Sequence, residues 1–185
     1  MLKKLKKCLK TEKKDTNIFD IVVYGSLVKG KSNPSDIDIV VIFNQGTLKE
    51  RLEKIQVMKK RINISIKIDI KGILFMELFD DNFFARSGIF LEGISLFDGK
   101  PISKKIGFES FVLFVYNLKN KSHTEKVKFN YVLSGRNDIG MIKRLNGEHV
   151  APGVVKIPIE HSLEFEDVLK LHEVSYSTNN VLVEV

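Results

Sequence analysis

Residues 18–43 of this 185-residue chain read IFDIVVYGSLVKGKSNPSDIDIVVIF. Two apolar, β-branched runs, Ile18–Tyr24 and Asp36–Phe43, enclose a Gly-Ser turn and a connection rich in Gly, Lys, Ser, Asn and Pro. This succession predicts a strand, a loop and a second strand. Because side chains alternate along a strand, Asp36 and Asp38 share one face of the second strand, whereas Ile37, Ile39 and Val41 share the other.

The loop between the two predicted strands has the composition of a phosphate-binding turn. Gly25-Ser26 offers backbone N–H groups and a hydroxyl to phosphate oxygens, and the glycine carries no side chain that would hold phosphates away. The two aspartates lie about 7 Å apart along the strand and supply hard oxygen ligands of the kind that Mg²⁺ prefers. The loop and the second strand together predict a site for phosphate groups and a divalent cation.

The same residues resemble the signature of the DNA polymerase β-like nucleotidyltransferase superfamily, in which Asp-x-Asp follows Gly-Ser after about ten residues. Here Ser26 precedes Asp36 by ten residues, and Gly30 lies four residues after Ser26. Lys29 stands where the family most often has arginine, so a point charge replaces a bidentate fork. The resemblance covers residues 1–100 and implies an α/β (α+β) fold, with a mixed sheet flanked by helices.

The resemblance also implies a third carboxylate on a later strand beside the Asp-x-Asp strand. Asp69 fits this position, because it lies near the end of Ile62–Ile70, where isoleucines alternate with polar residues and predict a strand with one solvated face. The alternative is an ordinary surface aspartate paired with Lys67 or Lys71. Asp20 is a weaker candidate, because it precedes the Gly-Ser turn.

By this resemblance, the protein is expected to be a nucleotidyltransferase that uses two Mg²⁺ ions, with Mn²⁺ as a substitute. Asp36, Asp38 and Asp69 would be the catalytic and metal-binding residues. The nucleotide-binding residues would be those of the loop, namely Gly25, Ser26, Lys29 and Gly30. The substrate would be ATP or another nucleoside triphosphate, whose nucleoside monophosphate is transferred to an acceptor hydroxyl.

The remainder of residues 1–100 predicts further elements around this centre. Met1–Asp15 has the pattern of an amphipathic helix, whose leucines are expected to pack on the domain rather than on a membrane surface. Thr47 and Glu50 form a capping-box pattern ahead of a helix. Gly72–Glu92 is expected to be helical for much of its length, and Ile94–Phe97 to form a short strand.

Residues 101–185 are expected to form a C-terminal extension of helices followed by a small α/β unit, with the boundary at the Asp-Gly-Lys-Pro turn of residues 98–102. The predicted helices are 103–118, 123–134 behind a Ser122/Glu125 capping box, and 162–172, and the predicted strands are 154–159 and 181–185. The glycines at 135 and 140 predict turns, and the four histidines lack the spacing of a zinc site.

Charge is segregated along the chain. Residues 1–14 carry a net +6 and residues 101–144 another +6, whereas residues 145–185 carry −5. Lys126, Lys128, Lys143 and Arg144 belong to the second basic block and are candidate contacts for nucleic acid, with Tyr116, Phe129 and Tyr131 interleaved for base stacking. The alternative is that the lysines are solvated helix faces and the aromatic residues the apolar faces of two helices.

The basic blocks favour a nucleic-acid 3′ end as the acceptor and disfavour a cationic aminoglycoside. Two alternatives remain: nucleotidylation of a protein partner, as small antitoxin-like members of the superfamily perform, or a catalytically inactive nucleotide- or nucleic-acid-binding module. The single Cys8 and the absence of any apolar run of about 18 residues predict a cytoplasmic protein without a membrane segment.

Overall fold

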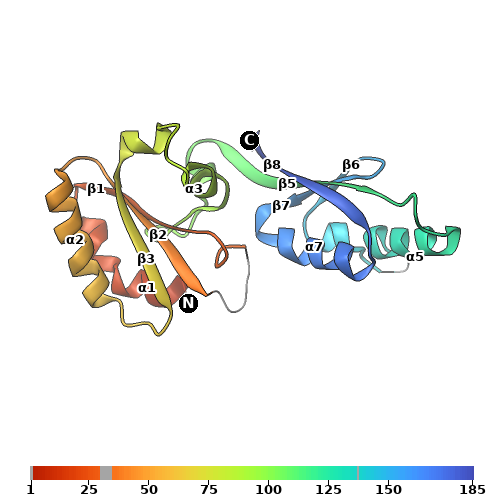
Figure 1. Ribbon diagram of the computed structural model, residues 1–185, viewed down its shortest axis with the longest axis horizontal. Helices are drawn as coiled ribbons and strands as arrows, with labels where there is room; N and C mark the ends of the chain where they lie inside the picture. The colour runs from red at the N-terminus through yellow and green to blue at the C-terminus, as the bar shows by residue number, and fades with distance from the viewer. Residues whose placement is uncertain (1, 30–34, 137) are drawn as a thin grey trace. The chain divides into compact units, whose positions relative to one another are not determined.

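A computed structural model of the chain describes residues 2–29, 35–136 and 138–185. The chain divides into two compact units, Met1–Gly107 and Phe108–Val185. Each unit contains one four-stranded sheet, drawn in Figure 1. No helix in the described part of the chain is long and apolar enough to cross a membrane.

The N-terminal unit is built on a mixed sheet with strand order β3-β2-β1-β4. β1 runs antiparallel to β2 and β4, whereas β2 and β3 are parallel. Its elements, in chain order, are α1 (Leu2–Cys8), the 3-10 helix η1 (Lys10–Lys14), β1 (Ile18–Tyr24), β2 (Asp36–Phe43), α2 (Leu48–Arg61), β3 (Lys67–Leu74), the 3-10 helix η2 (Phe75–Phe79), α3 (Arg86–Glu92), β4 (Ile94–Ser95) and α4 (Ile102–Lys105).

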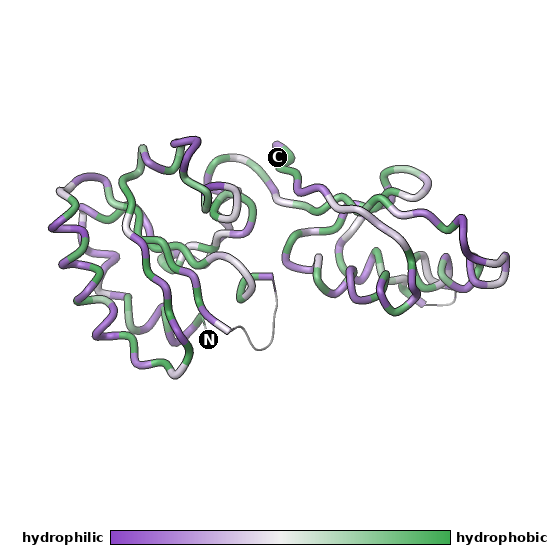
Figure 2. The backbone as a smooth tube through the Cα atoms, in the orientation of Figure 1, coloured by the Kyte–Doolittle hydropathy of each residue, from purple (hydrophilic) through white to green (hydrophobic). Residues whose placement is uncertain are grey.

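Helices cover both faces of this sheet because β1 and β2 carry apolar side chains on both faces. On one face, Ile37 and Ile39 pack with Leu5 of α1 and with Met58 of α2. On the other face, Val40 and its neighbours pack with residues of η2, α3 and α4. Figure 2 shows the middle of β1 and β2 as hydrophobic, whereas α2 alternates between hydrophobic and hydrophilic residues. Apart from the buried Asp20, the middle of β1 and the part of β2 after Asp38 carry apolar side chains.

Several sequence predictions for this unit are confirmed. Both strands of the opening stretch have the predicted bounds, and the Thr47/Glu50 capping box is present. Leu5 and Leu9 are buried in the domain, as expected for a helix that packs on its own unit. All seven lysines of residues 1–14 are exposed, so this basic block is a solvated surface.

Two predicted boundaries in this unit are wrong. The strand predicted to begin at Ile62 begins at Lys67, as β3. Residues 62–66 form a loop, in which Ile62, Ile64 and Ile66 are partly buried against the core. The strand then continues through Leu74, into the segment that was expected to be helical. Pairing with the whole length of β2 explains both differences, since partner contacts outside the local sequence decide where a strand begins and ends.

The C-terminal unit is an antiparallel sheet with strand order β6-β7-β5-β8. In Figure 1 its helices α5 and α7 lie along one face of the sheet. Its elements are β5 (Phe108–Asn117), α5 (His123–Ser134), α6 (Met141–Arg144), β6 (Glu148–Ala151), β7 (Val154–Pro158), the 3-10 helix η3 (Ile159–His161), α7 (Ser162–Leu171) and β8 (Ser175–Glu184).

The prediction of a helix over Ser103–Leu118 is wrong for most of its length. Only α4 is helical there, and β5 occupies Phe108–Asn117 at the centre of the second sheet. Alternate residues of β5, among them Val112, Phe114 and Tyr116, are buried under the helices. In β5 every second side chain is buried, and the residues are mostly aromatic or β-branched. Both features are typical of a half-buried strand.

The other predicted helices and strands of the C-terminal unit are present, with some differences in their bounds. The helix over 123–134 and its Ser122/Glu125 capping box are present, and α7 ends one residue before the predicted end. β7 closely matches the predicted strand, whereas β8 begins six residues earlier than expected, at Ser175. β8 pairs with β5 over its whole length, so its first residues are held in the strand by pairing rather than by composition.

Candidate active site

The loop that follows β1 begins with a turn that only glycine accommodates well. Gly25 has φ +81°, and the N–H groups of Val28 and Lys29 donate to its carbonyl at 3.0 and 3.3 Å. A Cβ atom at Gly25 would lie 2.8 Å from Oδ2 of Asp38. The turn and the Asp-x-Asp strand are therefore in direct contact; the positive φ makes any side chain at Gly25 strained, and a Cβ atom there would also displace the Asp38 carboxylate.

The strand register brings three carboxylates to one face of the sheet. Asp36 and Asp38 lie two residues apart on β2, and the parallel pairing of β2 with β3 sets Asp69 beside Asp38. Paired residues of adjacent strands point to the same face, so all three side chains leave the sheet on the side of the Gly25 turn. Tyr24, the last residue of β1, pairs with Asp38 from the other side.

The cluster of Asp36, Asp38 and Asp69 carries negative charge that Lys71 compensates only in part. Burial raises the pKa of Asp38, and the negative charges of Asp36 and Asp69 raise it further, against a smaller opposing effect of Lys71. Burial and the charges of Asp38 and Asp69 also raise the pKa of Tyr24 to about 12. A cation bound among these oxygens would relieve this repulsion.

The donor set fits a hard divalent cation, although the side chains do not close around one. Within residues 2–29, 35–136 and 138–185, no group of three or more His, Cys, Asp or Glu side chains is arranged to hold a metal ion. The side chain of Asp69 is 49% exposed, and its Oδ2 lies 3.9 Å from Nζ of Lys71. Ligation by all three carboxylates would therefore require rotation of side chains.

Lys29 is held by a carboxylate that the sequence did not single out. Its Nζ lies 2.8 Å from Oε1 of Glu92, the last residue of α3, and Glu92 is only 8% exposed. Nothing in the local sequence links these residues, because the contact depends on the packing of α3 beside β1. Lys29 would have to leave Glu92, or share it, in order to bind a phosphate.

The other predicted site residues have different surroundings. Ser26 is partly exposed in the turn, and Gly30 lies outside the described residues. Asp20 is fully buried and receives hydrogen bonds from Lys105 at 2.6 Å and Ser95 at 2.8 Å. These bonds give Asp20 a structural role within the unit, away from the Gly25 turn that follows β1.

The predicted nucleic-acid contacts lie in the C-terminal unit. The sequence indicated Tyr116 and Phe129 as stacking residues because they are interleaved with the basic residues. In the structure they are 9% and 2% exposed, and their rings pack edge to face. Tyr131 is exposed, with the Arg136 guanidinium over its ring. Arg144 forms an ion pair with Glu164, and the lysines at 126, 128 and 143 have no ion pair among the described residues.

Comparison with known proteins agrees with the geometry of the N-terminal unit. Residues 2–90 match the nucleotidyltransferase domain family, a match that includes the Gly25 turn and all three carboxylates. This part of the chain is therefore a polymerase β-like nucleotidyltransferase domain, with the mixed sheet expected from the sequence. No curated protein matches the chain.

The contact between Gly25 and Asp38 leads to a first prediction. Gly25→Ala should lower the free energy of unfolding by more than the ~1–2 kcal/mol expected for a non-glycine residue at positive φ, because the new Cβ atom also displaces Asp38. Gly107→Ala is a matched control, since Gly107 has φ +83° and no atom lies within 4 Å of the position that its Cβ atom would occupy. Equal losses in chemical denaturation would show that the Asp38 contact carries no energy.

Proposed function

We propose that the N-terminal unit transfers a nucleoside monophosphate from a nucleoside triphosphate to a hydroxyl group of an acceptor. The register that sets Asp69 beside Asp38, on the face next to the Gly25 turn, carries this proposal. It joins a phosphate-binding turn to a cluster of hard oxygen ligands, as in-line phosphoryl transfer requires. The raised pKa of Asp38 supports a role in cation binding rather than in folding.

In this proposal the turn binds the leaving part of the substrate. The Ser26 hydroxyl and the backbone N–H groups at the start of the turn, ahead of Val28 and Lys29, contact the β- and γ-phosphates, and the Lys29 side chain adds a positive charge. Asp36, Asp38 and Asp69 would hold Mg²⁺. When bound, the metal would neutralise phosphate charge and stabilise the oxygens at which charge develops.

The chemical step is a balanced displacement at the α-phosphorus. Asp69 accepts the proton of the acceptor hydroxyl, whose oxygen forms a new bond to the α-phosphorus. The bond from that phosphorus to the β-phosphate oxygen breaks, and pyrophosphate leaves with the electron pair. Since the chain itself contributes mainly charge and position, its effect on the rate depends on how well these residues orient the two substrates.

The acceptor favoured by the charge pattern is a nucleic-acid 3′ end. The exposed lysines of residues 1–14 and the lysines at 126, 128 and 143, which have no ion pair among the described residues, support attraction of a polyanion. Tyr116 and Phe129 are buried, so of the three candidate stacking residues only Tyr131 is exposed.

The decisive experiment follows an α-labelled nucleoside triphosphate. The protein is incubated with each of the four triphosphates, Mg²⁺ or Mn²⁺, and RNA, DNA or a lysate protein fraction, and the labelled macromolecule is identified. Label on RNA or DNA supports the nucleic-acid acceptor, and label on a protein supports nucleotidylation of a partner. Metal-dependent nucleotide binding without any transfer would contradict the proposal and support an inactive binding module.

The Lys29–Glu92 contact provides a second prediction. Lys29→Ala should raise the KM for the triphosphate several-fold and also lower stability, because it leaves the buried Glu92 carboxylate unpaired. The double variant Lys29→Ala/Glu92→Gln should regain stability and keep the high KM. If the KM returns to the wild-type value together with stability, Lys29 has no direct contact with the nucleotide.

A further inference from the structure

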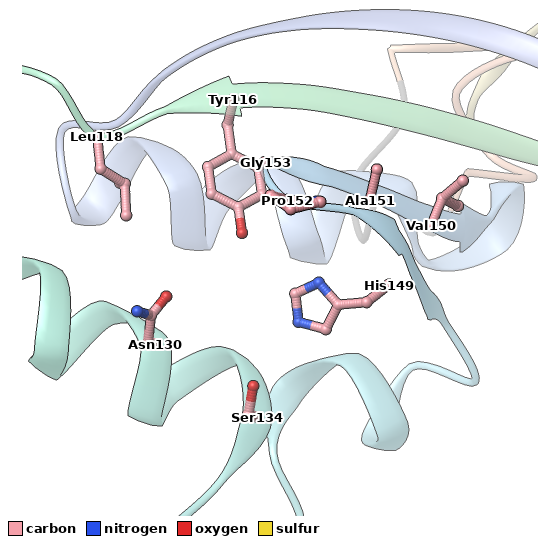
Figure 3. Close-up of a pocket in the computed structure, with 9 residues that line it drawn as sticks. All are labelled: Tyr116, Leu118, Asn130, Ser134, His149, Val150, Ala151, Pro152 and Gly153. Carbon is pink, nitrogen blue, oxygen red and sulfur yellow. The ribbon is translucent and has the colours of Figure 1, made fainter.

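The C-terminal unit contains a pocket lined entirely by residues of that unit. It has a volume of about 620 Å³, and Figure 3 shows it between α5, the end of β5 and the β6–β7 hairpin. Four polar residues line it, namely Tyr116, Asn130, Ser134 and His149, together with Leu118 and residues 150–153 of the hairpin. Its volume is in the range of small-molecule binding sites.

Backbone packing fixes one wall of this pocket. The N–H of Tyr116 donates to the carbonyl of Gly153 at 2.8 Å, at the tip of the β6–β7 hairpin. Gly153 has φ +77°, and a Cβ atom there would lie 2.7 Å from the carbonyl oxygen of Tyr116. The absence of a side chain at Gly153 therefore lets the hairpin lie against β5 and sets His149 opposite α5.

The polar groups of the pocket converge and have no partners among the residues that the structure describes. Figure 3 shows the Tyr116 hydroxyl, the Asn130 amide, the Ser134 hydroxyl and the His149 ring directed toward a common space. Within the described residues, none of these four side chains forms a hydrogen bond. Burial raises the pKa of Tyr116, so its hydroxyl remains a hydrogen-bond donor at neutral pH. The residues that line the pocket include no carboxylate or ammonium group.

A positive charge lies one helical turn from the pocket. Lys126, Asn130 and Ser134 are spaced by four residues on α5, so they lie on the same face of the helix, about 6 Å apart between successive Cβ atoms. Lys126 is partly exposed and has no ion pair among the described residues. The pocket thus combines a neutral, polar lining, in which Tyr116 is buried and Asn130, Ser134 and His149 are open to solvent, with a cation one helical turn away.

We propose that this pocket binds a nucleotide, with its base and ribose inside and its phosphate at Lys126. The Asn130 amide presents a donor and an acceptor side by side, which matches the edge of a nucleobase. The Tyr116 and Ser134 hydroxyls and the His149 ring supply further hydrogen bonds and a planar surface. A free amino acid would need charged partners inside the pocket, and a neutral sugar would leave Lys126 unused.

The test measures binding of nucleoside 5′-monophosphates and of short RNA and DNA oligonucleotides to the full chain by calorimetry. Monophosphates lack the β- and γ-phosphates that the Gly25 turn would hold, and the Asp38→Asn protein should bind them as well as wild type. We expect affinity at about 1 mM or tighter, weakened about tenfold by Asn130→Leu. Asn130→Asp, which keeps the shape of the side chain, should have a similar effect because it removes a donor and repels the phosphate.

A matched pair of lysine variants tests the position of the phosphate. Lys126→Gln should weaken binding several-fold, whereas Lys128→Gln, two residues away on the same helix, should change it little. Equal affinity for monophosphates and oligonucleotides would identify a free nucleotide as ligand, and tighter binding of an oligonucleotide would identify a strand. Absence of binding to every ligand, or binding unaffected by both Asn130 variants, would overturn the proposal and leave the transfer reaction untouched.

Discussion

Replacing Asp38 by Asn is expected to lower the rate of nucleotide transfer about a thousandfold, because it removes a ligand charge from the metal-binding cluster and keeps the side-chain volume. Asp36→Asn should behave in the same way. Asp167→Asn provides a matched control, since Asp167 is exposed on α7 of the other unit. Transfer at the wild-type rate by the Asp36→Asn/Asp38→Asn double variant would contradict a mechanism that depends on these carboxylates.

The same Asp38→Asn substitution should raise the melting temperature by a few degrees. The raised pKa of Asp38 means that the folded protein binds its proton more tightly than the unfolded chain does. Stability therefore falls as pH rises from about 3.8 through the folded-state pKa, and the full cost is present at neutral pH. Asn removes this cost and flattens the pH dependence. Mg²⁺ should raise the melting temperature of the wild type more than that of the variant, a readout that does not require an acceptor.

The largest loss of stability is expected from Lys105→Met. Lys105 lies 2.6 Å from Oδ2 of Asp20, which is completely buried, and 3.0 Å from Oδ2 of Asp98. Removal of the ammonium group leaves a buried carboxylate whose remaining partners are neutral, so we expect a loss of about 3 kcal/mol in the free energy of unfolding. Urea denaturation followed by circular dichroism measures this change.

Two further measurements separate the ion pair from simple loss of side-chain packing. The double variant Asp20→Asn/Lys105→Met should recover part of the lost stability, and Lys100→Met, at an exposed lysine nearby, should lose almost none. Burial lowers the pKa of Lys105, but its bonds to Asp20 and Asp98 outweigh this and leave the pKa above the ordinary 10.5. The contribution of the pair is therefore complete below pH 10.5 and should disappear as the pH rises through the folded-state value. If the Asp20→Asn/Lys105→Met variant is no more stable than Lys105→Met, the lost free energy of unfolding comes from packing alone.

Local sequence was sufficient to predict the central part of the N-terminal fold. β1 and β2 follow directly from apolar, β-branched runs interrupted by turn residues, and the two capping boxes mark the first residues of α2 and α5. For residues 108–117 the sequence predicts a helix and the structure has the strand β5, because a nearly continuous apolar run fits either period when no pairing partner is known. Its register with β7 and β8 supplies that partner and removes the ambiguity.

The sequence by itself determined the residues of the turn and of the Asp-x-Asp strand, because a positive φ, a close approach and side-chain alternation are properties of short segments. Only the tertiary structure decided which distant groups meet them. The parallel register sets Asp69, which no local pattern but only the family resemblance indicated, beside Asp38, and the packing of α3 places Glu92 against Lys29. The tertiary structure also places Lys105 beside Asp20, so Asp20 forms an ion pair within the unit and is not part of the Gly25 turn. These pairings depend on how helices and strands that are distant in sequence pack against the sheet. The packing energies involve residues far apart in the chain, so no local pattern of residues determines them.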